Sequence, residues 1–153
     1  MFVKSYTSLP IEFEVVRSAL LSCARDWLEP VAADTERHGE RLLSEVGLQG
    51  SSRLQRSARL ELGEAVLSTE RTTSLALGIH VEDSARMLPS LEGTLDAAWL
   101  GSGLSYLALS VGYESGSGPL GHIVDRVLLH RVMEATALYF VEAAARRLAA
   151  RGR

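Results

Sequence analysis

Residues 91–113 read LEGTLDAAWLGSGLSYLALSVGY, and this stretch decides the fold. Apolar residues alternate with small or polar ones on both sides of Gly101–Gly103, which is the period-two pattern of β-strands. A glycine-bounded turn between two such strands indicates a β-hairpin. The residues expected to share a face are Leu91, Gly93, Leu95, Ala97 and Trp99 in the first strand, and Leu107, Leu109, Val111 and Tyr113 in the second.

Upstream of this hairpin the same period continues. Residues 54–62 and 73–81 alternate in the same way, and Gly63-Glu64 is expected to form a turn after the earlier strand. A further strand is expected at Phe2–Ser8. Because the connections between the central strands are short, we expect an antiparallel sheet.

Two helices are expected between the first strand and the remaining ones. Pro10 suits a helix start, and apolar residues follow at helical spacing from Ile11 to Leu28, until Pro30 interrupts the run. A second helix is expected over residues 34–46, because Asp34 can cap its start and Gly47 can end it.

A long helix is expected downstream, from about Leu120 to Ala150, where it would run roughly 45 Å. Packing along most of its length must support a helix of this size. Its apolar residues define one broad arc, which we expect to face the sheet: Leu120, Ile123, Val124, Val127, Leu128, Ala135 and Leu138.

These elements predict one α+β domain over residues 1–153, in which a curved antiparallel sheet carries two N-terminal helices and a long C-terminal helix packed across it, the helix-grip fold. The net charge of −3 gives no electrostatic reason to expect a nucleic-acid partner. Cys23 is the single cysteine, so no intrachain disulfide can form. We expect a cytoplasmic protein, because there is no signal-peptide pattern and glycines and serines interrupt the uncharged run 97–113.

The element order resembles the START-like superfamily (SRPBCC), which includes polyketide cyclase/dehydrase and lipid-transport proteins. The residues that carry the resemblance are Leu9-Pro10, the hairpin 91–113, and Gly118-Pro-Leu-Gly121 before the last helix. The segment 124–132 looks like bacterial members of unassigned function. The resemblance implies a cavity between the sheet and the C-terminal helix that takes a small apolar molecule. It implies no particular catalytic residue.

Polar residues in the last helix are the candidates for chemistry. Glu134 falls inside the expected apolar arc, where a carboxylate must be paired to be tolerated. His130 at i−4 and Arg131 at i−3 can both reach it. The cluster is either a local ion pair or a polar anchor in a cavity. A metal site is not expected, because no third ligand can be placed beside His130 and Glu134.

We therefore expect binding of a small hydrophobic ligand (a lipid, a quinone or a polyketide-like aromatic), with no cofactor and no stable membrane insertion, by a monomer or homodimer. One alternative is a cyclase- or dehydratase-type enzyme that uses His130 and Glu134 as acid and base. Another is a protein-interaction module without a cavity. The predicted ligand-binding residues are Trp99, Tyr113, Val127, His130, Arg131, Glu134 and Leu138.

Overall fold

The computed structural model describes residues 1–45, 58–81, 90–113 and 126–151. Expected features at residues 46–57, 82–89 and 114–125 lie outside the described part of the chain, including the start of the first central strand, Gly118–Gly121 and the first apolar residues of the long helix. The elements follow in the order β1 (Phe2–Leu9), α1 (Phe13–Ser22), α2 (Ala24–Glu45), β2 (Ala58–Thr69), β3 (Thr72–Val81), β4 (Leu91–Gly101), β5 (Leu104–Gly112) and α3 (Arg126–Arg151).

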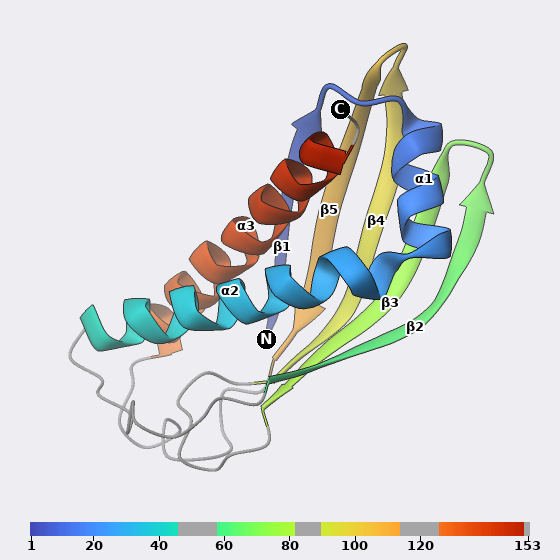
Figure 1. The fold of residues 1–153 in the computed structure, drawn as a ribbon. Coiled ribbons are helices and arrows are strands. Elements are labelled where there is room, and N and C mark those ends of the chain that lie inside the picture. Colours follow the sequence, from blue (N-terminus) through green and yellow to red (C-terminus); the bar gives the residue numbers. More distant parts are fainter. Residues whose placement is uncertain (46–57, 82–89, 114–125, 152–153) are drawn as a thin grey trace.

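Within the described residues, five strands form one antiparallel sheet in the order β1-β5-β4-β3-β2, and α1, α2 and α3 lie over one of its faces (Figure 1). α3 packs on β1 and β5, while α2 packs across α3 and α1 lies over the central strands. This arrangement confirms the expected α+β fold with two N-terminal helices and a long C-terminal helix.

The hairpin expected over residues 91–113 is confirmed. β4 and β5 pair in register, with Leu95 opposite Leu109, and Gly103 closes the turn with a φ of +70°, a backbone conformation that favours glycine. The helix-covered face holds the sheet's part of the core, which includes Val3, Leu9, Leu60, Leu75, Leu77, Ile79, Leu91, Leu95, Ala97, Leu107, Leu109 and Val111.

The expected break at Pro30 is wrong, because the chain bends at Cys23 and Pro30 lies inside α2. The Trp27 indole donates a hydrogen bond of 3.0 Å to the Ala19 carbonyl, which holds the start of α2 against the end of α1. Burial of Trp27 and of Leu28 outweighs the backbone hydrogen bond that a proline in a helix loses.

The expected turn at Gly63-Glu64 is also wrong. β2 continues to Thr69, and its register against β3 shifts between Leu62 and Ala65, which marks a β-bulge. A Cβ at Gly63 would lie 2.9 Å from the Cβ of Ala76, so the bulge brings two backbones too close for a side chain. Gly63 does mark an irregularity in the strand, but the irregularity is a bulge within β2 and not a turn between two strands.

The face of α3 that meets the sheet is nearly opposite to the expected arc. Val127 and Leu138 are 61% and 42% exposed, and Ala135 is exposed as well. Apolar residues occur almost all round this helix, so spacing alone did not select one face. The buried residues of α3 are Leu129, Val132, Met133, Thr136, Ala137, Phe140, Val141, Ala143, Ala144 and Leu148.

Candidate functional site

Three of the residues predicted to bind ligand form a chain of polar contacts between the sheet and α3. Tyr113 follows β5 directly, and its hydroxyl oxygen lies 2.9 Å from Nδ1 of His130, near the start of α3. His130 Nε2 lies 3.2 Å from Oε1 of Glu134, one helical turn further on. The hydrogen bond between Tyr113 and His130 can pass a proton between them, and Glu134 lies beside the other ring nitrogen.

The side chains of Tyr113, His130 and Glu134 lead from the protein interior to solvent. Tyr113 is 4% exposed, whereas the side chains of His130 and Glu134 are 30% and 58% exposed. Burial raises the pKa of the Tyr113 hydroxyl, and the negative charge of Glu134 raises it further. Tyr113 therefore keeps its proton at neutral pH and acts as an uncharged hydroxyl.

The backbone of Tyr113 is held at the same place by β-type bonds to Met1. The Tyr113 N–H donates to the Met1 carbonyl at 2.9 Å, and the Met1 amino group donates to the Tyr113 carbonyl at 2.7 Å. These contacts and the buried ring leave the hydroxyl of Tyr113 in one position relative to His130.

The expectation for Glu134 is confirmed in its partner and wrong in its position. The contact with His130 forms at the expected i, i+4 spacing. The carboxylate, however, is exposed and does not point into the core, because α3 is rotated relative to the expected arc. Arg131 is also exposed. The roles of these residues in ligand binding stay a prediction.

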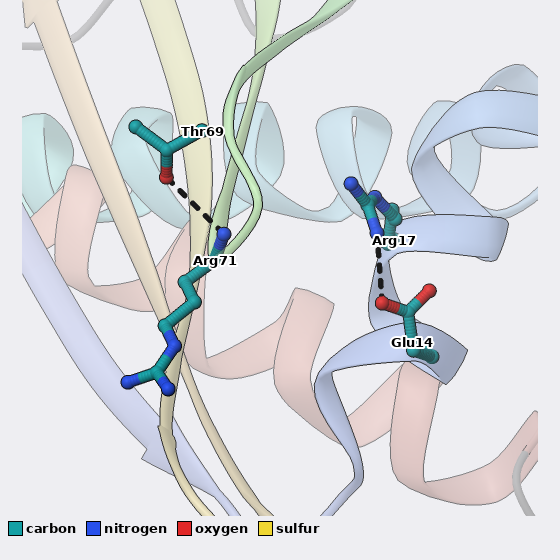
Figure 2. A network of polar contacts seen from close by, with 4 residues as sticks. All are labelled: Glu14, Arg17, Thr69 and Arg71. Carbon is teal, nitrogen blue, oxygen red and sulfur yellow. Dashed lines mark hydrogen bonds and ion pairs between the residues drawn. The ribbon is translucent and has the colours of Figure 1, made fainter.

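Trp99, another of the predicted ligand-binding residues, lies against a cation. The guanidinium of Arg71, in the β2–β3 turn, lies 4.2 Å from the centre of the Trp99 ring, and Trp99 is 39% exposed. Figure 2 shows Arg71 here with Thr69, whose hydroxyl accepts the Arg71 backbone N–H, and the surface pair Glu14–Arg17 on α1.

A pocket of about 490 Å³ lies at the junction of α1 and α2, above β2 and β3. It forms where the chain bends at Cys23 on one side and where β2 bulges at Gly63 on the other. Its lining mixes apolar and polar groups: Leu20, Leu21, Ser22, Cys23, Ala24, Arg25, Asp26, Leu62, Gly63, Glu64 and Leu75.

Two polar groups of this pocket are tied to other elements. Arg25 donates to the Leu60 carbonyl at 3.3 Å, and Arg151 at the end of α3 donates to the Cys23 sulfur at 3.1 Å. None of the seven predicted ligand-binding residues lines the pocket. Sequence reasoning missed it because both of its walls arise from irregularities, a helix bend and a bulge, that periodicity does not reveal.

The remaining described histidines lie outside both sites. His80 is on the open face of the sheet, where its Nε2 is 3.1 Å from Glu61 and 3.6 Å from Glu92. His38 is half-buried, and its ring stacks on Tyr139 with 4.2 Å between the ring centres. Within the described residues, no group of three or more His, Cys, Asp or Glu side chains could hold a metal ion.

No helix in the part of the chain that the structure describes is both long and apolar enough to cross a membrane. Comparison with known protein families and with curated proteins finds no match. Among solved structures, the chain is similar to TTHA0849 from Thermus thermophilus, with 12% sequence identity and a TM-score of 0.45 over the whole of both chains. This degree of similarity supports no inference about function.

Proposed function

We propose that this protein binds a small organic molecule with an apolar body and a polar end in the pocket at the α1–α2 junction. The observation that carries the proposal is the pocket itself. Its volume of about 490 Å³ falls in the range of known small-molecule sites, roughly 300–1,000 Å³.

The lining suits a molecule of that chemistry. Leu20 and Leu75 are each 2% exposed and form an apolar floor together with Leu62. Arg25 and Glu64 at the pocket supply a hydrogen-bond donor and an acceptor for a polar end.

The resemblance to START-like proteins supports an apolar ligand but implies a different position, beneath the C-terminal helix. None of the described residues of α3 lines the pocket at the α1–α2 junction. Lipids, quinones and polyketide-like aromatics stay the ligand classes to test, and the residues predicted around α3 are a second position for them.

A thermal-shift screen over fatty acids, quinones, flavonoids and polyketide-like aromatics tests the proposal. A ligand at a hundredfold excess over its Kd stabilises the fold by about 2.7 kcal/mol. For a domain of this size, that corresponds to a rise in Tm of roughly 5–10 °C. Because Cys23 lines the pocket and is the single thiol, a bound ligand should also slow its modification by a disulfide reagent.

Two variants of α1 locate the ligand. Leu21 lines the pocket and is 53% exposed, whereas Val15 is 47% exposed on the same helix and is not part of the lining. Leu21→Asp should reduce the ligand-induced shift, and Val15→Asp should leave it unchanged. If both variants behave alike and Cys23 is not protected, the ligand does not occupy this pocket. If no compound raises Tm, the proposed function is wrong.

A further inference from the structure

Both ring nitrogens of His130 are already engaged. When the neutral imidazole carries its proton on Nε2, Nδ1 accepts the hydroxyl proton of Tyr113 at 2.9 Å, while Nε2 faces the Glu134 carboxylate at 3.2 Å. The expected role of His130 as an acid or base in direct contact with a substrate stays a prediction. The Tyr113 hydroxyl oxygen is the buried end of the chain and can act on another molecule.

A flexible side chain, that of Met1, contacts this hydroxyl. The Met1 sulfur lies 3.6 Å from it, and Met1 is 49% exposed. A thioether is a weak hydrogen-bond acceptor on a flexible side chain, so a ligand oxygen or an acidic C–H group can take its place at small cost. The ring of Tyr113 would stay fixed, because its backbone is bonded on both sides to the Met1 backbone.

The hydroxyl has one proton and two acceptors, Nδ1 of His130 and the Met1 sulfur. With neutral imidazole, the proton points to Nδ1 and the oxygen offers a lone pair toward the Met1 side. With imidazolium, Nδ1–H donates to the oxygen, and the hydroxyl proton turns toward Met1. The same atom thus presents a base or an acid, and the state of His130 decides which.

We propose that Tyr113, His130 and Glu134 form a proton-transfer site that acts on a small carbonyl compound with an acidic C–H group. The C–H bond breaks, and its proton goes to the Tyr113 oxygen as the hydroxyl's own proton moves to His130 Nδ1. The electron pair stays on the substrate as an enolate, and Glu134 stabilises the imidazolium. The reverse transfer restores both molecules, so no oxidant or other reactant is consumed.

The raised pKa of Tyr113 fits this sequence of events. A free phenolate is disfavoured there, whereas the coupled transfer keeps the oxygen protonated throughout. Glu134 acts through His130 and is a positioning residue, since its carboxylate orients the ring and favours the tautomer that accepts from Tyr113.

Deuterium incorporation into 2-tetralone in D₂O, followed by NMR, tests the proposal. The protein should accelerate exchange at the carbon next to the carbonyl, and Tyr113→Phe should lower this acceleration roughly a hundredfold, in line with general acid–base catalysis. His130→Gln and Glu134→Gln should also lower it, and Glu134→Asp should restore part of it. The ¹⁵N shifts of His130 should show the Nε2–H tautomer in the wild type and a changed tautomer population in Glu134→Gln.

Two controls exclude a structural or general effect. Tyr6→Phe removes the hydroxyl of a tyrosine that is 65% exposed, and His80→Gln breaks a histidine–glutamate pair on the open face of the sheet. Both controls should exchange at the wild-type rate. The proposal is overturned if the wild type does not accelerate exchange, or if Tyr113→Phe, with unchanged Tm, exchanges as fast as the controls. These outcomes are independent of the pocket at the α1–α2 junction.

Discussion

The orientation of α3 can be tested by truncating two neighbouring side chains on opposite sides of the helix. Phe140 is fully buried, whereas Leu138 is 42% exposed. Phe140→Ala removes a ring from the core and should destabilise the protein by about 3–5 kcal/mol. Leu138→Ala removes a side chain that stays partly in water and introduces a better helix former, so it should cost about 1 kcal/mol or less.

Urea unfolding followed by circular dichroism measures both costs, and an unchanged dependence on urea concentration shows that the two variants unfold from the same kind of state. At roughly 2–4 °C per kcal/mol for a domain of this size, Phe140→Ala should lower Tm by about 6–20 °C. Leu138→Ala should lower it by no more than about 4 °C. If Leu138→Ala costs as much as Phe140→Ala, or more, α3 presents to the sheet the arc that sequence spacing selected, and the rotation described above is wrong.

Two further predictions concern buried polar groups. The fully buried hydroxyl of Thr73 has no hydrogen-bond partner among the described residues, so Thr73→Val should stabilise the protein by about 1 kcal/mol in urea unfolding. In contrast, Thr136→Val should not stabilise it, because the Thr136 hydroxyl bonds a backbone carbonyl at 2.7 Å. Partial burial against Tyr139, and then the charge of Arg41, lower the pKa of His38 below its ordinary value of 6.5. The folded protein thus binds fewer protons than the unfolded chain, so the wild type should lose stability relative to His38→Gln as the pH falls below about 6.5, and an NMR titration of His38 should show the lowered pKa.

The sheet could be predicted from sequence because its signals are local. In residues 91–113 the alternation and the Gly101–Gly103 turn specify both strands and their connection, and Leu95 and Leu109 meet as the shared face requires. A one-residue slip would expose the whole apolar face, so the pattern sets the register as well. β1 was predictable for the same reason, since its alternation is uninterrupted from Phe2 to Ser8.

The helix boundary and the bulge were not predictable in this way, because each depends on a contact between elements. Pro30 is a strong local signal for a helix end, yet the bond from Trp27 to Ala19 sets the bend at Cys23 instead. Gly63 likewise signals an irregularity, but whether it is a turn or a bulge depends on how β2 meets β3. The pocket lies between these two irregularities, so the errors in the fold and the failure to find the pocket have one origin.

In the Tyr113–His130–Glu134 chain, one contact could be predicted from sequence although the predicted face of α3 was wrong, and the other could not. The i, i+4 spacing of His130 and Glu134 places them one turn apart on any straight helix, so their contact was predictable although the face was wrong. Their meeting with Tyr113 depends instead on where the first turns of α3 cross the end of β5, which no spacing encodes. The rotation of α3 also changes what the pair can do. On the expected face, Glu134 would have been the buried polar residue of the site. In the structure Glu134 is exposed, and the buried polar residue is Tyr113. A carboxylate beside Nε2 favours the His130 tautomer that carries its proton on that nitrogen, and this tautomer leaves Nδ1 to accept the proton of Tyr113.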